Sequence, residues 1–253
     1  MYLCFSILLN QTFGAFNFVF MRIRITLFLL ILFLQTVVSQ DIVKSSPFIF
    51  YPSAYQKWEY KICTGISLTR LPNQIVEEEI NTLPMISADF RMGLPLKLVL
   101  HSQINTNYIS NKFSLGLQKN IIDGKIALAV GANASLWYGQ LHQEVIRLDA
   151  FGGILNPYIV GGVRFKDVYL SLKVENQYGI MKTFSEGVSL GKSSQPNSAY
   201  SFHFTIEQPL WNNHWVAMGF KLNYAKFNYQ SWLTYSAINQ FLLYPEYSFK
   251  YIF

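Results

Sequence analysis

The last residues of the chain alternate strictly between aromatic and other side chains. From Tyr247 to Phe253 a ring occupies every second position, with Ser248, Lys250 and Ile252 between the rings. A period of two places alternate side chains on opposite faces of a β-strand. A strand with four rings on one face fits the wall of a membrane β-barrel, whose aromatic face meets lipid while its polar face lines the lumen.

Composition favours a barrel over a helical membrane protein. Aromatic residues make up 17% of the chain and charged residues only 13%, about half the roughly 25% of soluble domains. After residue 40, no segment reaches the roughly 18 consecutive apolar residues that a spanning helix needs. Without such a helix, only a closed barrel satisfies all backbone hydrogen bonds in lipid. The rival fold, a soluble β-sandwich, would carry more surface charge.

The chain end from Tyr244 to Phe253 resembles the closing strand of bacterial outer-membrane β-barrels. In that family the barrel-assembly machinery reads the terminal aromatic residue. The resemblance therefore implies outer-membrane lipid and that machinery as partners. It also implies an assembly signal formed by Tyr247, Phe249, Tyr251 and Phe253.

The N-terminal region predicts export. Residues 21–39 hold Arg22 and Arg24, an apolar core and small or modest residues at the end, the pattern of a signal peptide cleaved between Ser39 and Gln40. That Ser-Gln junction resembles those of secreted proteins of the Bacteroidota.

The leader divides the chain into parts. Residues 1–20 are expected to be a non-native upstream extension, with an uncleaved N-terminal membrane helix as the alternative. Residues 40–56 are predicted to be a periplasmic tether and residues 57–253 the barrel. Cys4 lies upstream of the leader, so Cys63 has no partner for a disulfide in the mature chain and is expected to fill space in the lumen.

The net charge of the mature chain is small. Of the 20 Lys and Arg, two lie in the leader, which leaves 18 against 14 acidic residues, or +4. The basic residues form no cluster with interleaved aromatics, which argues against a nucleic-acid partner.

Alternation along the rest of the chain predicts an all-β, up-and-down antiparallel transmembrane barrel of about ten strands, with eight or twelve as alternatives. Connections after even strands are tight, as at Asp123-Gly124, and most others are longer, which matches short periplasmic turns and long extracellular loops. The predicted strands lie near 57–69, 85–92, 96–105, 113–117, 126–136, a segment ending at 165, 168–177, 200–207, 216–224 and 247–253. The longer loops are expected at 71–81, 138–153, 180–197 and 229–243.

Aromatic residues near the strand ends predict two girdles at the lipid–water interfaces. One would contain Trp58, Trp211, Trp215 and Phe253, and the other Tyr108, Trp137, Tyr138, Tyr178 and Trp232.

The lumen-facing positions carry an unusual number of charges. Buried charges need partners, and a small barrel is filled by its own side chains, so a plug of salt bridges is expected. The alternative is a narrow pore that favours anions, because seven Lys or Arg stand against four acids. The predicted lumen residues are Glu59, Lys61, Asp89, Arg91, Lys97, His101, Arg164, Lys173, Glu175, His203, Glu207, Lys221 and Lys250.

One strand face carries the residue types of an esterase. His203 lies two positions from both Ser201 and Thr205, and Glu207 follows on the same face, which is similar to the catalytic set of outer-membrane lipid A deacylases. Those enzymes hold their catalytic groups at the outer rim facing lipid, whereas these residues face the lumen. Catalysis is therefore disfavoured.

Further motifs give weaker signals. Asp149 with His142 is the only nearby counterpart of the Asp/His constellation of the ten-stranded omptin proteases. Gly187 to Ser193 resembles a phosphate-binding P-loop, but it has three residues between the glycines where the motif has four, which favours a surface loop. Glu77 to Glu79 would hold a surface cation or, preferably, form a solvated acidic loop. No metal-ligand spacing links His101, His142, His203 and His214.

The sequence therefore predicts a non-enzymatic outer-membrane barrel without metal or cofactor, whose extracellular loops contact a ligand or partner. A small porin-like passive pore for anionic or polar solutes is the first alternative. A lipid- or peptide-hydrolysing barrel enzyme is the second.

Overall fold

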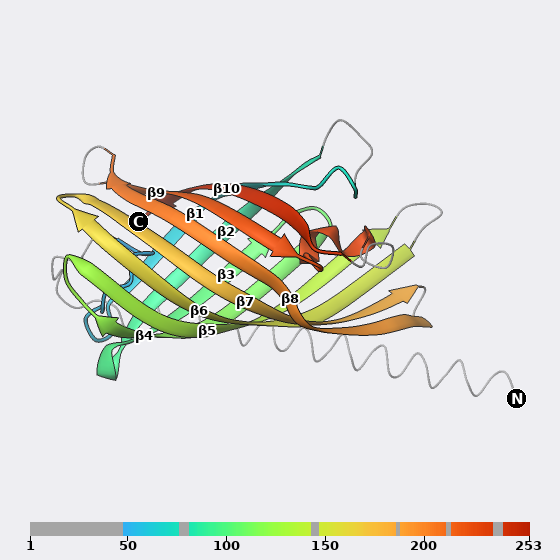
Figure 1. Ribbon diagram of the computed structural model, residues 1–253, viewed down its shortest axis with the longest axis horizontal. Coiled ribbons are helices and arrows are strands. Elements are labelled where there is room, and N and C mark those ends of the chain that lie inside the picture. The colour runs from blue at the N-terminus through green and yellow to red at the C-terminus, as the bar shows by residue number, and fades with distance from the viewer. Residues whose placement is uncertain (1–47, 76–80, 143–146, 186–187, 211–213, 235–239) are drawn as a thin grey trace, which may run out of the picture. The chain divides into compact units, whose positions relative to one another are not determined.

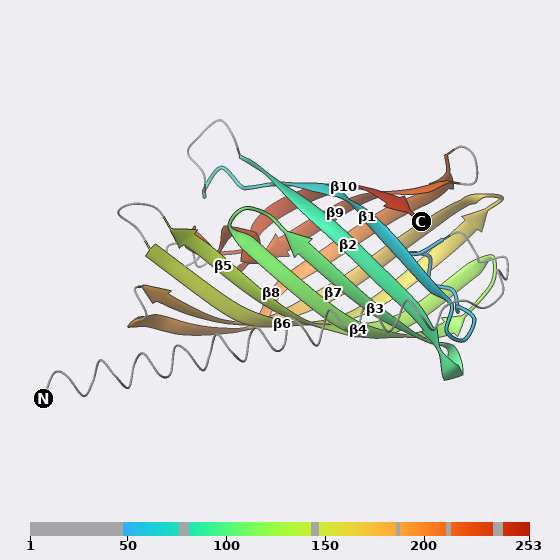
Figure 2. The ribbon, with the colours of Figure 1, turned by 180° about the vertical axis from the view of Figure 1, so that it is seen from behind.

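Ten antiparallel strands pair in chain order, and β1 pairs with β10 to close a barrel (Figures 1 and 2). This confirms the predicted up-and-down all-β barrel. The computed structural model describes residues 48–75, 81–142, 147–185, 188–210, 214–234 and 240–253. The strands are β1 (Tyr60–Arg70), β2 (Thr82–Leu94), β3 (Leu98–Thr106), β4 (Ser110–Ile122), β5 (Ile126–His142), β6 (Arg147–Phe165), β7 (Val168–Ser185), β8 (Val188–Pro209), β9 (Trp215–Ala225) and β10 (Leu242–Ile252).

The wall of the barrel has a polar inner face and an apolar outer face. In β1, Lys61, Cys63 and Ser67 are buried inside while Ile62 and Ile66 between them are exposed outside. Every strand contributes to the outer apolar surface, which therefore continues around the barrel and exceeds the few hundred Å² usual for one apolar patch on a soluble monomer. It includes Ile62, Ile66, Ile86, Ile104, Leu115, Leu117, Val130, Leu136, Leu155, Ile159, Leu172, Val174, Phe202, Phe204, Met218 and Phe249.

The connections after even strands are tight, as the sequence predicts. The β2–β3 connection contains the short 3₁₀ turn η1 (Pro95–Lys97), in which Leu96 has φ 63° and Lys97 has φ 58°. Because β3 begins only at Leu98, Lys97 lies on this turn and its predicted position in the lumen is wrong. In the β4–β5 turn the backbone of Gly124 has φ 140°, a conformation that favours glycine.

Two of the predicted long loops are strands over most of their length. Residues 138–142 and 147–153 continue β5 and β6, with Gln140 paired to Asp149. Residues 180–185 and 188–197 continue β7 and β8, with Lys182 paired to Lys192. The loop predictions fail because alternation marks only a strand with one apolar and one polar face. A hairpin with polar surroundings on both sides keeps its backbone pairing without that pattern.

The predicted girdles are partly wrong. Trp137 and Trp232 are only 2% and 3% exposed and lie inside the barrel, where Trp137 packs against Phe227 with ring centroids 5.4 Å apart. Trp215 also turns inward, against Tyr169. Trp58, Tyr108, Tyr138, Tyr178 and Phe253 are exposed, and Trp211 lies outside the described residues.

In the parts of the chain that the structure describes, no helix has the length and apolarity to cross a membrane.

Candidate functional site

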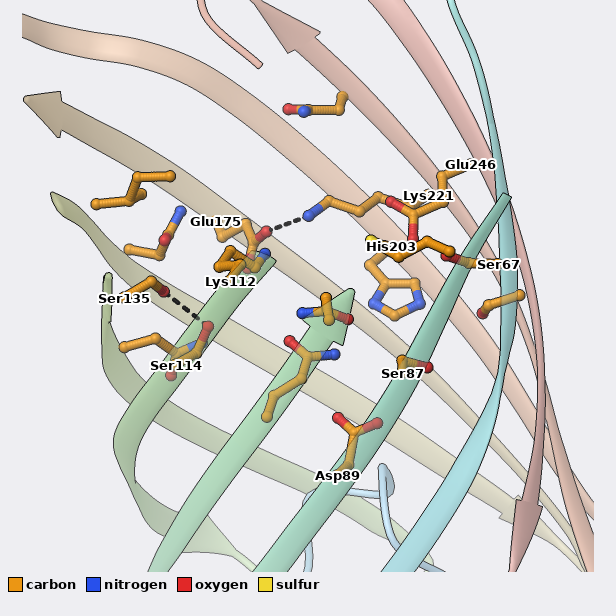
Figure 3. Close-up of a pocket in the computed structure, with 18 of the residues that line it drawn as sticks. Ser67, Ser87, Asp89, Lys112, Ser114, Ser135, Glu175, His203, Lys221 and Glu246 are labelled. Carbon is orange, nitrogen blue, oxygen red and sulfur yellow. Dashed lines mark hydrogen bonds and ion pairs between the residues drawn. The ribbon is translucent and has the colours of Figure 1, made fainter. Parts of the chain in front are cut away.

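The barrel encloses a polar cavity of about 120 Å³, several times the volume that a single buried water needs. Its walls come from the inner faces of the strands (Figure 3). One end is lined by Phe50, from the segment that precedes β1, and the other by Asn228, Tyr229 and Gln230, from the connection between β9 and β10. The cavity is therefore bounded by two segments that are not strands.

A carboxylate between two lysines forms the strongest charge cluster in the cavity. Glu175 on β7 contacts the Nζ atoms of Lys173 and Lys221, each at 2.7 Å. Figure 3 shows the contact with Lys221. Lys173 also lies 4.2 Å from the ring centroid of Tyr158. The hydroxyl of Tyr158 lies 3.2 Å from Nε2 of His101, so the cluster continues across the lumen to β3.

A second ion pair joins β2 and β10 across β1. The Nζ of Lys250 lies 2.6 Å from Oδ2 of Asp89, and both side chains are almost fully buried. The thiol of Cys63 donates to the same oxygen at 3.7 Å. The small side chain of Cys63 thus leaves room for a salt bridge between strands that are not neighbours.

We expect Asp89→Asn to destabilise the barrel by about 3 kcal/mol, because it leaves the buried ammonium of Lys250 without a counter-charge. The double variant Asp89→Asn with Lys250→Met should recover most of that loss. The stability of the wild-type protein, the single variant and the double variant is measured by thermal unfolding. The loss of the folded band on unboiled gels monitors the unfolding. Lys97→Met, which breaks the exposed pair with Asp123, serves as control and should change little. A double variant as unstable as the single one would contradict the pairing.

The floor of the cavity is the chain segment 48–55, which folds into the end of the barrel near the C-terminus (Figures 1 and 2). Oε1 of Glu207 accepts hydrogen bonds from the backbone N–H groups of Ile49, at 2.6 Å, and Phe50, at 2.9 Å. Oε2 accepts a third from Tyr51 at 2.7 Å. One fully buried carboxylate on β8 thus holds three consecutive backbone donors.

Aromatic packing completes the floor. Phe48 and Tyr51 both pack on Tyr169, with ring centroids 4.9 and 5.2 Å apart. The ammonium of Lys61 donates to the carbonyl of Phe48 and lies 4.3 Å from the ring centroid of Tyr55. Burial raises the pKa of Tyr55, so its hydroxyl stays neutral and donates to the carbonyl of Ile49 at 2.9 Å.

This floor corrects the prediction of a tether over residues 40–56, of which the structure describes the part from residue 48. The predicted tether contains Pro47 and Pro52. The signal against it was the run from Phe48 to Tyr51, whose aromatic and apolar side chains favour burial.

The roof of the cavity is the β9–β10 connection, with the short 3₁₀ turn η2 (Tyr229–Thr234). The Tyr229 hydroxyl donates to Sδ of Met85 at 3.0 Å. The indole of Trp232 fits against Gly139 so closely that a Cβ on this glycine would lie 2.3 Å from its ring nitrogen. The predicted loop at 229–243 therefore turns into the barrel over its first residues.

The predicted lumen residues fall into four groups. The cavity is lined by Asp89, Arg91, His101, Lys173, Glu175, His203, Lys221 and Lys250. Lys61 and Glu207 bind the floor segment, and Glu59 lies beside Lys61. Arg164 lies at the rim with its guanidinium 5.2 Å from the ring centroid of Tyr169. Lys97 lies on the η1 turn.

Two charged cavity residues were missing from the prediction. Lys112 on β4 and Glu246 on β10 both line the cavity (Figure 3). The alternation that predicts their strands, extended by one residue at each strand's start, would have found them. On the outer face, the proposed assembly residues Tyr247, Phe249 and Phe253 are exposed and Tyr251 is half-buried.

The esterase-like residues do not form a catalytic chain. The Ser201 hydroxyl donates to Oδ1 of Asn223 at 2.7 Å, and His203 Nε2 lies 3.3 Å from the Thr205 hydroxyl. The carboxylate of Glu207 is bound by backbone N–H groups of the floor.

The structure describes some of the weaker motifs, and the others lie outside the described residues. The Tyr138 hydroxyl donates to Asp149 at 2.9 Å, while the side chain of His142 lies outside the described part. Residues 188–193 of the P-loop-like run belong to β8, so the preference for a loop there is wrong. Glu77 to Glu79 lie outside the described residues. No group of three or more His, Cys, Asp or Glu within the described ranges is arranged to hold a metal ion.

The sequence matches no protein-family model, and no curated protein matches it. Among solved structures, the chain is similar to the outer membrane protease OmpT of Escherichia coli, with 10% identity, a TM-score of 0.40, and 82% of this chain and 97% of that chain covered. It is also similar to Neisserial surface protein A, with 9% identity, a TM-score of 0.37 and coverage of 76% and 95%. An outer membrane channel from Pseudomonas putida F1 is 8% identical, with a TM-score of 0.37, and 81% of this chain and 99% of that chain are covered. Similarity at this level carries no argument about activity.

Proposed function

We propose that this protein is an integral outer-membrane β-barrel, exported through its leader, whose lumen is closed and whose extracellular hairpins contact a ligand or partner. Two features support the membrane location: the apolar outer face contributed by all ten strands, and the polar inner face. In water, so large an apolar surface would drive association.

The packed floor and roof are the observation that supports the non-conducting role. The floor segment is held by three hydrogen bonds to Glu207, and the roof is packed through Trp232 and Trp137. Between them lies the polar cavity of about 120 Å³. A small porin-like pore for anions would require both segments to move.

The length of the hairpins supports a role in contact. Strands β7 and β8 have 18 and 22 residues, whereas about 9–11 residues cross a bilayer. Their connection lies at the end of the barrel opposite to Phe253. Roughly half of this hairpin would therefore project beyond the membrane. If the chain termini lie in the periplasm, the opposite end of the barrel, where this hairpin projects, is extracellular.

The test uses the full chain expressed with its own leader in a Gram-negative host. We expect it in the outer-membrane fraction, with different mobility in boiled and unboiled samples. In a planar bilayer the folded protein should give no steady conductance. Steady, anion-selective current would instead support the pore. A lipid profile or surface proteome that changes with His203→Ala would support the hydrolase, and recovery from the soluble fraction would contradict the barrel's membrane location.

A further inference from the structure

Lys112 lies on the inner face of β4 with its ammonium group turned into the cavity. Its Nζ lies 4.5 Å from the ring centroid of Tyr229, directly under the roof. Within the described residues, no carboxylate oxygen lies within ion-pair distance of this Nζ. A cation enclosed in this way is expected to be costly unless a counter-charge comes close.

The neighbours of Lys112 increase its need for an anion. Lys173 and Lys221 both use the single carboxylate of Glu175, so this acid is already bound by two lysines from strands other than that of Lys112. Glu246 also lines the cavity, from β10. Over the whole cavity, Arg91, Lys112, Lys173, Lys221 and Lys250 stand against Asp89, Glu175 and Glu246, a surplus of two positive charges with the histidines neutral.

Neutral donors surround the same space. Ser114 and Ser135 meet at 2.8 Å on the neighbouring strands β4 and β5 (Figure 3). Across the cavity, the Ser67 hydroxyl is 1% exposed and has no hydrogen-bond partner within the described residues. Ammonium groups and hydroxyl donors around a small enclosed volume are the groups that bind an oxyanion.

We propose that the lumen is a binding site for one small oxyanion of the phosphate or sulfate type, held under the roof by Lys112 with Lys173 and Lys221. The anion neutralises the cationic surplus and adds hydrogen bonds to the serine hydroxyls. The site belongs to the interior of the barrel, so its occupancy does not depend on whether the protein conducts or on what the hairpins contact.

The test compares thermal unfolding of the folded full-length protein in sodium phosphate and in sodium chloride of equal ionic strength. Phosphate should raise the midpoint of the wild-type protein by about 5 °C when its concentration far exceeds the dissociation constant. Lys112→Met should lose most of this shift, because removing one charged donor weakens the anion's binding by about tenfold or more. In chloride the same variant should be at least as stable as wild type, since it removes a cavity charge that has no carboxylate of the described residues within ion-pair distance.

Lys119→Met is the matched control. Lys119 belongs to the same strand but is exposed on the outer face, so this variant should keep the full phosphate shift, including any general salting effect. Lys112→Arg, which keeps the charge, should retain part of it. An equal shift in wild type, Lys112→Met and Lys119→Met would overturn the proposal, as would the absence of any shift in the wild type. Sulfate in place of phosphate shows whether the site accepts tetrahedral oxyanions in general.

Discussion

Glu207→Ala is expected to release the floor segment and to lower the stability of the barrel by about 3 kcal/mol or more. The substitution removes the acceptor of three backbone hydrogen bonds, to Ile49, Phe50 and Tyr51. Each buried donor left without a partner costs about 1–3 kcal/mol. Once released, the segment exposes Phe48 and Tyr51 to water and to protease. The measurement is limited proteolysis of the folded protein, combined with the temperature at which the folded band disappears.

Glu246→Gln provides the control for this change. It alters another glutamate of the lumen, one that lines the cavity and accepts none of the described hydrogen bonds from the floor segment. We expect this variant to keep the floor segment protected from protease. If Glu207→Ala leaves the segment as protected as in the wild-type protein, Glu207 does not hold the floor in place. Conductance should stay absent in both variants, because the roof formed around Trp232 remains.

Leu115→Arg is expected to disrupt the barrel or prevent its assembly. Leu115 lies near the middle of β4 with its side chain on the outer face, 47% exposed in the isolated protein. If this face lies in lipid, an arginine near the bilayer midplane costs about 2–4 kcal/mol. The folded, heat-modifiable band should decrease strongly in the outer-membrane fraction, and the remaining folded protein should unfold at lower temperature.

Tyr108→Arg is the matched control, with the same new residue placed outside the apolar belt. Tyr108 lies in the connection between β3 and β4 and is 97% exposed. Its replacement should leave assembly and stability unchanged. Equal tolerance of both arginines would show that the face containing Leu115 does not lie in lipid.

Local pattern was enough to predict the wall of the barrel. In β1 and β10 the alternation from residue to residue already assigns each side chain to a face, because a strand has a period of two whatever it pairs with. The same pattern placed Lys173, Glu175 and Lys221 inside, since each lies within a clearly alternating strand. Asp123-Gly124 marked a tight turn because glycine accepts the positive φ found there.

Only the tertiary structure decided which segments form the floor and the roof of the cavity and which charges meet in it. The bond from Glu207 to Ile49 spans 158 positions of the chain, and no local pattern links a carboxylate on a late strand to backbone donors before the first. The contact of Lys221 with Glu175 depends on the register of β7, β8 and β9, which is set by the pairing of whole strands. The sequence by itself therefore determined the strands and their two faces, which follow from neighbouring residues. The floor, the roof and the contacts of Glu175 with Lys173 and Lys221 arise from long-range packing and register.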